Sequence, residues 1–548
     1  MSRHRFPSSP LPMELLLERL QSLTPTIKEI CRISGTPGIS LGVLHHGEVI
    51  YTNNFGFRNV ATKTPPDEDT LYYIASMSKA YTAAGIAILV EQKKLKWETP
   101  VSNILPDFLH PDASIRENAS MVDFLSHRSG LASANAMWFT EFGHLALPIE
   151  ETVRFASHLD VVHPFRQKWL YSNWGYGLAD LVVEKLTGKS WGQFQTESIF
   201  HLLGMVNTTV HHVPESKNFA EGYMSLSNGT PYHVPRPELE DGKILGGAAA
   251  IQTNVRESLI FYKSLLEAAE SQKTGSKSSS PLKEVPKLFQ PHIPLEANAS
   301  LQKRSYALGW VRTELPGALG KIGQNSRWKR QMPLVGKGLE KPRLCLYHEG
   351  SLLSFLSSVH LLPDSQSAIV VLTNSMANSD VADWVGEMLL EAVLDNPDKN
   401  DYLQIAKETI KSSLSAWPRM AVWLEERREP GTSPQSLQAY EGIYWNGPHN
   451  WSVEIFVEKD QLTMCFQGNR EQTYALHHYH HDVFSWLLTR DENVIDYGRF
   501  PVTMPPFYLI SFQIDKKTGV VKELLWKHDG DVPAGETFWK DSQTKMEL

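Results

Sequence analysis

The chain has 548 residues, of which 41% are hydrophobic, 10% aromatic and 21% charged. This composition is that of an ordinary globular protein with a sizeable core, and it excludes disorder over most of the length. The 53 basic and 61 acidic residues give a formal net charge of −8, which does not favour binding to nucleic acid or to an anionic membrane.

The cysteines and the N-terminal sequence indicate the cellular compartment in which we expect the protein. Cys31, Cys345 and Cys465 are too few and too far apart for a disulfide framework or a cysteine-based zinc site, and we interpret them as free thiols in a reducing compartment. The amphipathic stretch after the basic N-terminus lacks the uninterrupted apolar run of a signal peptide, and no segment reaches the ~18 apolar residues of a membrane span. The sequence therefore predicts a cytoplasmic protein with no membrane partner.

Apolar spacing predicts the elements of the first half of the chain. A helix is predicted over residues 13–33, followed by a β-hairpin that turns at Gly47. Residues 76–95 are apolar on nearly every side, which is typical of a helix buried in the centre of a domain. Further helices are predicted at 121–126, 149–158, 174–187, 191–203 and 254–270.

Strands return late in the sequence. Residues 353–362 and 368–372 read as a strand pair, and a helix is predicted at 379–394. Strands at both ends with helices between them predict an α/β (α+β) fold, in which helices flank one antiparallel sheet and a helical subdomain is inserted in its middle.

Two stretches of the first 400 residues look irregular. Residues 271–280 are polar and of low complexity, which predicts a mobile surface loop. Residues 316–343 carry seven basic residues against the single acid Glu340. A solvated loop and a docking surface for an anionic substrate or an acyl carrier protein both stay open as interpretations.

The character of the sequence changes after residue 400. A helix predicted at 401–426 leads into linker residues, and short segments rich in aromatic and β-branched residues follow at 451–457, 461–466 and 507–514. Regular short strands predict a small all-β barrel or sandwich. We therefore expect a first domain at 1–400, a helical linker at 401–434 and an all-β domain at 435–548.

The leading chemical signal is Ser76-Met77-Ser78-Lys79 at the head of the predicted buried helix. A serine hydroxyl needs a nearby base, and a lysine three residues further lies on the same helix face. Burial lowers the pKa of such a lysine and leaves it neutral, as a base must be. Other Ser-x-x-Lys sequences, such as the one at Ser280, do not open a buried helix.

Two further motifs are candidates for the same site. Tyr171-Ser172-Asn173 precedes the predicted helix at 174–187, and His348-Glu349-Gly350 lies just ahead of the late strand pair. Both types of motif also occur elsewhere in the chain, so each alone is weak.

The order and surroundings of these motifs resemble the serine β-lactamase and penicillin-binding-protein superfamily, especially its esterase and D-aminopeptidase branch. The resemblance covers about residues 15–395. It rests on the phrases at 69–79, 124–131, 171–178, 203–209, 306–310 and 347–350.

The resemblance implies roles for the first two motifs. Ser76 would be the acylated nucleophile. Lys79 and Tyr171 would take its proton and later activate the deacylating water or alcohol. Asn173 would hydrogen-bond Lys79 and the substrate.

The third motif would bind and position the substrate. His348 stands where many relatives have lysine, and Gly350 would let the strand approach the substrate. The backbone N–H groups of Ser76 and Ser351 would form the oxyanion hole. Relatives often have glycine shortly after this motif, whereas here Ser351 is followed by Leu-Leu-Ser-Phe, which puts the acceptor pocket in doubt. No deacylation signature of the Glu-x-x-x-Asn type is identifiable, so efficient β-lactam hydrolysis is not implied.

The C-terminal segment resembles the lipocalin-like barrel that follows the catalytic domain in some relatives. In such proteins the barrel can lend a loop to the rim of the active site. A run of histidines at 477–481 invites a metal interpretation, but adjacent histidines on a strand point to opposite faces. We interpret the run as structural surface, and we expect no metal and no cofactor.

Three functions follow from these motifs. The first is a metal-independent serine hydrolase that cleaves a small-molecule ester or amide, such as a D-amino-acid peptide, through an acyl-enzyme on Ser76. The second is an acyltransferase or thioesterase of secondary-metabolite tailoring, which acts on a thioester delivered by an acyl carrier protein. The third is a non-catalytic scaffold, against which the joint presence of Ser76, Lys79, Tyr171 and Asn173 argues.

Overall fold

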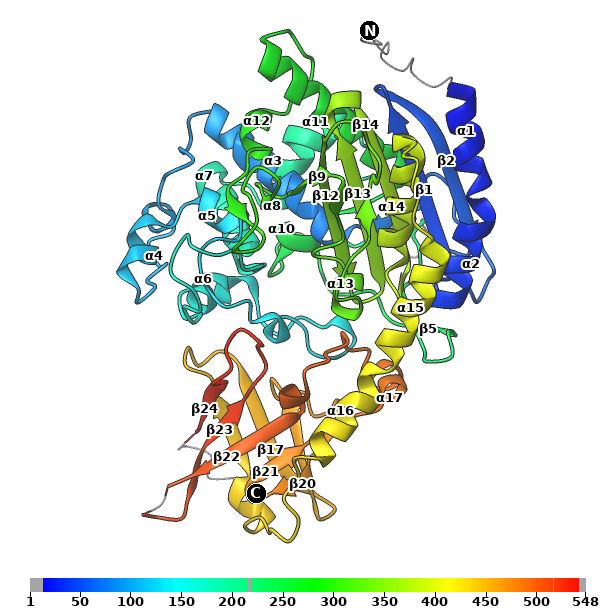
Figure 1. Ribbon diagram of the computed structural model, residues 1–548. Coiled ribbons are helices and arrows are strands. Elements are labelled where there is room, and N and C mark those ends of the chain that lie inside the picture. The colour runs from blue at the N-terminus through cyan, green and yellow to red at the C-terminus, as the bar shows by residue number, and fades with distance from the viewer. Residues whose placement is uncertain (1–12, 215–217, 516, 542–548) are drawn as a thin grey trace.

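An eight-stranded antiparallel sheet forms the centre of the larger domain in the computed structural model, which describes residues 13–214, 218–515 and 517–541 (Figure 1). Strands from both ends of this domain pair side by side, as the sequence predicts. In spatial order the strands are β2 (Glu48–Gly56), β1 (Gly38–His45), β14 (Ser367–Thr373), β13 (Phe355–Leu362), β12 (Arg343–Leu352), β9 (Val311–Leu315), β8 (Arg304–Tyr306) and β7 (Ile293–Pro294).

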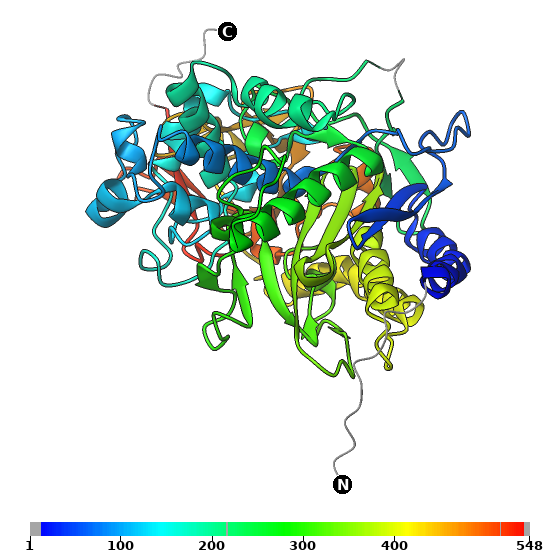
Figure 2. The same ribbon diagram turned by 90° about the horizontal axis from the view of Figure 1, so that it is seen from above.

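Helices cover both faces of this sheet (Figure 2). Side chains alternate between the faces of a strand: Val370 and Leu372 of β14 join one apolar cluster, whereas Ile369 and Val371 join the other. The first face packs against α11 (Val255–Thr274), and the second packs against α14 (Val381–Leu394). Helices α1 (Met13–Ser22) and α2 (Thr24–Ser34) contact α14 and pack on the same face of the sheet.

A helical subdomain is inserted between β2 and β7. Its centre is α3 (Ser78–Glu91), which is buried along nearly its whole length and is preceded by a 3₁₀ turn at Ala75–Met77. Helices α5 (Met121–Leu125), α7 (Trp174–Thr187) and α10 (Gly246–Ala249) pack around α3. The predicted buried helix and the predicted fold class are therefore confirmed.

Several predicted helices have different bounds. The helix predicted at 13–33 is two helices that meet at Leu23, and α11 continues four residues into the predicted loop, to Thr274. The region 191–203 divides into α8 (Trp191–Gln195), a π-helical turn at Thr196–Phe200 and α9 (His201–Leu203).

Strand β12 was missed by the sequence analysis, which placed His348 ahead of a strand pair. His348 lies inside β12, so the late sheet region has three strands. The hydrophobic pattern of a buried strand is interrupted here, because polar residues such as Glu349 are buried in β12. A polar residue normally indicates an exposed position.

The C-terminal part of the chain is an all-β barrel, as predicted. Two helices, α15 (Tyr402–Leu414) and α16 (Ala416–Glu425), lead into it. The first and last strands of its sheet, β19 and β20, are consecutive in the chain, so the sheet curls into a nearly closed barrel. In spatial order the strands are β19 (Tyr474–Ala475), β18 (Gln461–Phe466), β17 (Ser452–Glu458), β16 (Gly442–Trp445), β24 (Glu536–Lys540), β23 (Val521–Trp526), β22 (Leu509–Ile514), β21 (Val483–Ser485) and β20 (His477–His480).

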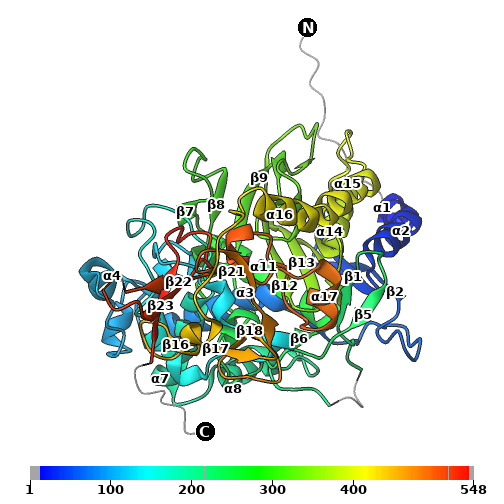
Figure 3. The same ribbon diagram turned by 90° about the horizontal axis from the view of Figure 1, so that it is seen from below.

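The barrel packs against one end of the larger domain (Figure 3). One cluster of buried apolar side chains includes Ala83 of α3, Trp174 of α7 and Phe466 of the barrel. The two parts of the chain therefore share a hydrophobic core. Among the described residues, no helix is both long and apolar enough to cross a bilayer.

Candidate active site

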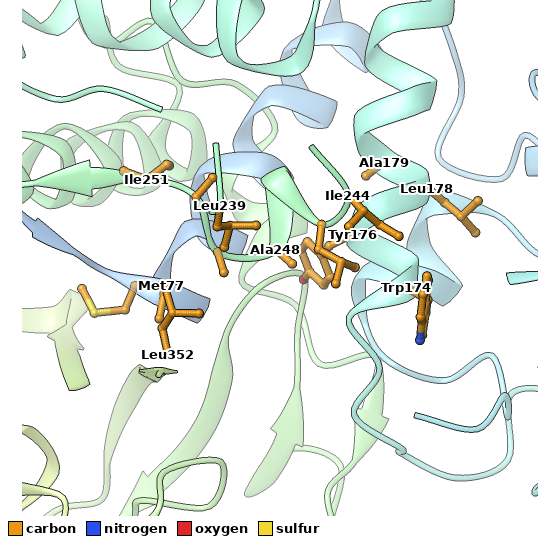
Figure 4. Close-up of a cluster of buried hydrophobic side chains, with 14 of the residues drawn as sticks. Met77, Trp174, Tyr176, Leu178, Ala179, Leu239, Ile244, Ala248, Ile251 and Leu352 are labelled. Atoms are coloured by element: carbon orange, nitrogen blue, oxygen red, sulfur yellow. The ribbon is translucent and has the colours of Figure 1, made fainter. Parts of the chain in front are cut away.

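Ser76 occupies a tight turn between β3 (Tyr72–Tyr73) and α3. Ala75, directly before it, has a φ of 47°, a left-handed conformation that side chains other than glycine rarely adopt. Met77, directly after it, is fully buried and belongs to the same apolar cluster as Leu352 (Figure 4). Ser76 itself is partly exposed, so the turn presents one hydroxyl group on an otherwise buried segment.

Lys79 lies one helical turn further, within reach of that hydroxyl. Its Nζ is 3.0 Å from Ser76 Oγ and donates a hydrogen bond to the carbonyl of Ala248, also at 3.0 Å. The side chain is fully buried, and this burial lowers the pKa of Lys79 well below its usual value, although Asp180 acts in the opposite direction. The geometry therefore provides a neutral amine that can accept the proton of Ser76.

Tyr171 contributes a second hydroxyl group to this site. Lys79 Nζ is 5.2 Å from the centre of its ring. The loss of solvent around the phenol raises the pKa of Tyr171, and a hydrogen bond with Ser76 lowers it by less. A neutral phenol is a poor base, so the arrangement favours Lys79 as the base and Tyr171 as a proton donor.

Asn173 has a different partner from the one that the resemblance implied. Its Nδ2 donates to Oδ1 of Asn135 at 3.4 Å, while the second bond of Lys79 goes to Ala248. Asn135, which the sequence analysis did not single out, therefore belongs to the surroundings of the site.

His348 lies across the site on β12 and is fully buried. Its Nε2 is 2.9 Å from the hydroxyl of Tyr306, and its Nδ1 is 2.7 Å from the carbonyl of Glu349. Burial, aided by the nearby Lys79, lowers the pKa of His348 to about 3. The imidazole is therefore neutral, unlike the lysine that many relatives have at this position.

Gly350 lets β12 lie directly against the turn that carries the nucleophile. A Cβ atom at this position would be 2.3 Å from the carbonyl oxygen of Ile74 and 2.2 Å from Ser357 Oγ. Pairing of β12 with β9 ends at Tyr347, so the edge from His348 to Leu352 has no β9 partner. This edge includes Ser351, the second predicted donor of an oxyanion hole.

Sequence reasoning missed two polar groups behind the site. His127 is buried with its ring centre 4.3 Å from that of Tyr171 and 4.7 Å from that of Tyr306. Asp180 of α7 accepts a hydrogen bond from the backbone of Gly247 at 2.8 Å. His127 stands in the phrase at 124–131, one of those that carry the family resemblance, which was a usable signal. Asp180 sits in an apolar helix pattern, and nothing in the sequence marks it.

Among the described residues, one group of side chains could hold a divalent metal ion, and it lies at β20 of the barrel, far from α3, which Ser76 precedes (Figure 1). Ligand atoms of Glu429, His480 and His481 are within 4.8 Å of one another. The two adjacent histidines meet because the strand register shifts before His480 and because His481 has a φ of 44°. The rule that adjacent histidines point to opposite faces therefore does not hold at this bulge.

Comparison with known families gives two matches. The sequence model of the Beta-lactamase family matches residues 25–410, and a domain of unknown function called DUF3471 matches residues 426–541.

Several characterised proteins are similar to the chain. The unguisins hydrolase of Aspergillus campestris (strain IBT 28561) is 25% identical over 83% of this chain and 79% of its own length. A penicillin-binding protein of Bacillus subtilis (strain 168) is 25% identical over 60% of this chain and 71% of its own. A beta-lactamase of Providencia stuartii is 24% identical over 65% and 86%.

A solved structure has the same fold. The octameric penicillin-binding protein homologue from Pyrococcus abyssi superposes with a TM-score of 0.55 at 21% identity. The superposition covers 96% of this chain and all of that one, so the likeness extends over the barrel as well as the larger domain.

Proposed function

Because the chain belongs to the beta-lactamase family, we propose that it is a serine hydrolase which cleaves a small-molecule ester or amide through an acyl-enzyme on Ser76. The observation that carries this proposal is the 3.0 Å approach of Ser76 Oγ to the buried amine of Lys79. A scaffold without turnover would have no need to keep a lysine out of water beside an exposed hydroxyl.

The proposed reaction has two halves. Ser76 Oγ attacks the carbonyl carbon of the substrate while Lys79 Nζ accepts its proton, and the backbone N–H groups of Ser76 and Ser351 stabilise the oxyanion. Tyr171 donates its proton to the leaving group and is reprotonated by Lys79. A water molecule then attacks the acyl carbon and gives up a proton to Lys79. Lys79 passes this proton to Ser76 Oγ as the acyl–oxygen bond breaks, which releases the acid and restores the serine hydroxyl.

The substrate would lie along the edge of β12 that has no β9 partner. There its polar groups would meet strand backbone, while the buried imidazole of His348 already has Tyr306 and Glu349 as partners. A neutral histidine adds no fixed positive charge to this edge, so we expect substrates without a carboxylate at this position. D-amino-acid peptides with a blocked or cyclic end fit this expectation.

Hydrolysis ranks ahead of acyl transfer for two reasons. The first is that relatives with assigned activities include an unguisins hydrolase and a beta-lactamase. The second is that three of the seven basic residues in the stretch 316–343 form ion pairs with acidic residues of the same chain. Lys321, Lys329 and Arg343 form ion pairs with Glu296, Glu408 and Asp364, respectively. The stretch therefore offers an acidic carrier protein less free charge than the sequence suggested.

Intact-mass spectrometry after exposure to a fluorophosphonate tests the nucleophile. We expect a single serine adduct on the wild type and no adduct on Ser76→Ala. Ser280→Ala is a matched control, because Ser280 heads another Ser-x-x-Lys sequence, and it should be labelled like the wild type. Absence of an adduct on folded wild type would favour the scaffold.

A panel of activated esters and thioesters then separates the two activities. A hydrolase releases the free acid from the Ser76 acyl-enzyme in water alone. A transferase accumulates the acyl-enzyme until an alcohol or amine is added.

A further inference from the structure

A stretch of the larger domain runs between the active site and the barrel. We call residues 133–147 the strap. At one end, Asn135 accepts the hydrogen bond from Asn173. Further along, a Cβ atom on Gly143 would lie 3.7 Å from Leu353, in the two-residue turn that follows β12. The strap therefore contacts both sides of the proposed substrate site, beside Tyr171 and beyond Ser351.

A carboxylate of the barrel holds the start of the strap. Oδ2 of Asp529 accepts hydrogen bonds from the backbone N–H of Ala134 at 2.7 Å and from Ser133 Oγ at 3.2 Å. Ala134 has a φ of 42°, a conformation that is unfavourable for alanine and persists only where the surroundings impose it. Asp529 is 7% exposed, so water competes little for these bonds.

The middle of the strap enters the mouth of the barrel. Glu141 is fully buried and accepts hydrogen bonds from the hydroxyl of Tyr474 and, at 3.4 Å, from the guanidinium of Arg499. That guanidinium is itself 5.0 Å from the ring centre of Phe466 and 5.5 Å from that of Trp486. A buried carboxylate is stable only with such a partner, so Arg499 is what allows Glu141 to occupy this position.

Further bonds secure the strap on either side of Glu141. The backbone N–H of Phe142 donates to the carbonyl of Tyr497 at 2.8 Å, and the side chain of Gln467 donates to the carbonyl of Ala146 at 2.7 Å. The barrel thus binds this stretch of its own chain much as other barrels bind a ligand.

From these contacts we propose that the barrel positions one wall of the active site by binding the strap. Arg499 and Asp529 are positioning residues: they touch no reacting atom, but through Glu141 and Ala134 they set where Asn135 stands. The wall that they fix determines how large an acyl group Ser76 accepts. This inference rests on the proposed hydrolase function.

The first test measures acyl selectivity. Acylation of Ser76 by para-nitrophenyl acetate and by para-nitrophenyl octanoate is followed in Asp529→Asn and Arg499→Met. Small displacements of positioning groups cost large factors in rate, so we expect the acetate-to-octanoate rate ratio to shift about tenfold in both variants. Arg499→Lys, which keeps the charge, should lie between Arg499→Met and the wild type.

Asp515→Asn is the matched control for Asp529→Asn. Asp515 also accepts backbone hydrogen bonds, but from Lys517 and Thr518 within a turn of the barrel itself. The acetate-to-octanoate rate ratio of Asp515→Asn should equal that of the wild type. A wild-type ratio in both Asp529→Asn and Arg499→Met would overturn the proposal.

Hydrogen exchange provides a readout that does not depend on activity. In Asp529→Asn and Arg499→Met, amides of the strap should exchange about tenfold faster, while amides of α3 keep their wild-type rates. Strap amides with unchanged protection would show that the barrel does not hold the strap, and would overturn the inference. A wild type that takes no fluorophosphonate on Ser76 would instead overturn the proposed function, and the exchange experiment would still decide whether the strap is held.

Discussion

At the scale of single residues, burial decides which group of the site is suited to the proposed role of base. It lowers the pKa of Lys79, and it raises the pKa of both Tyr171 and Asp180. All three groups are thereby favoured in their neutral forms. Of these forms only the amine of Lys79 is a good proton acceptor, so one physical cause selects the base and keeps Tyr171 available as a donor.

Replacement of Lys79 by methionine should separate catalysis from stability. A general base contributes about 10²–10⁴-fold to rate, so acylation of Ser76 in Lys79→Met should slow by about that factor. The melting temperature should not fall, because an apolar side chain of similar length replaces a buried amine. Stopped-flow acylation and thermal unfolding measure the two effects. Lys96→Met, at an exposed position, should change neither the acylation rate nor the melting temperature. Acylation of Lys79→Met at the wild-type rate would mean that another group is the base.

At the scale of elements, the site depends on how closely β12 approaches the turn at Ser76. Ser357 of β13 donates a hydrogen bond to the carbonyl of Ile74 at 2.8 Å, and Gly350 leaves room for that contact. The sheet and the turn at Ser76 are thus in direct contact, close in the sequence to both predicted oxyanion donors, Ser76 and Ser351.

Gly350→Ala should disturb this junction. The added methyl group cannot fit between Ile74 and Ser357, and overpacking of this kind costs about 1–3 kcal/mol of the free energy of unfolding. Acylation should slow at least tenfold, because β12 must move away from Ser76. This factor corresponds to about 1.4 kcal/mol of activation free energy. Gly447→Ala serves as the control, since its Cβ would have no neighbour closer than 3.9 Å. A Gly350→Ala protein with wild-type rates would mean that Ser351 plays no part in the oxyanion hole.

Elements with a strong periodicity of hydrophobic residues were predictable from the sequence. Elements shaped by contacts with distant parts of the chain were not. Helix α7 has the predicted bounds, since its apolar pattern is local. Strand β12 was missed because its polar residues are buried by elements far away in the chain. The motifs of Ser76, Tyr171 and His348 were found by their local phrases, and the structure brings them together. Tyr306 opens the phrase at 306–310, but nothing local places it beside His348, and Asn135 carries no local signal at all, because both positions arise from the fold.

At the scale of the whole molecule, stability should depend on a cluster of carboxyl groups behind β12. Glu349, Asp380, Asp383 and Glu387 are all buried, and desolvation raises their pKa values, that of Asp380 to about 6. Repulsion by neighbouring carboxylates raises those of the other three further. The folded protein therefore holds protons that the unfolded chain releases above about pH 4.

The sign of the pH dependence follows from this proton balance. Groups with raised pKa values stabilise the fold at low pH, and this stability is lost as the pH rises through their folded values. Each such group lowers the free energy of unfolding by about 1.4 kcal/mol per pH unit between its unfolded and folded pKa. The buried His348 and His360, whose pKa values fall to about 3, act oppositely but only below about pH 6.5.

Thermal unfolding between pH 6.5 and 9 tests the carboxyl cluster. The three groups of the cluster with strongly raised pKa values outweigh the opposite effect of Lys79, whose lowered pKa stabilises the fold as the pH rises. We expect the melting temperature to fall as the pH rises over this range. Glu387→Gln should make the decline shallower, because it removes one group that must lose a proton. Glu98→Gln, at an exposed position, should follow the wild-type curve. A flat wild-type curve would show that the cluster is already ionised in the folded protein.

The burial of Glu141 in the barrel also has a consequence for synthesis of the chain. Its partner Arg499 lies 358 residues further along the sequence. At the usual ~5–20 residues per second of translation, the larger domain emerges from the ribosome well before the barrel can form. During that interval Ser76, Lys79 and the central sheet are in place, while the strap has nothing to bind. On the proposed function, a nascent chain should thus acquire a reactive Ser76 early and its full selectivity only when the last hundred or so residues have folded.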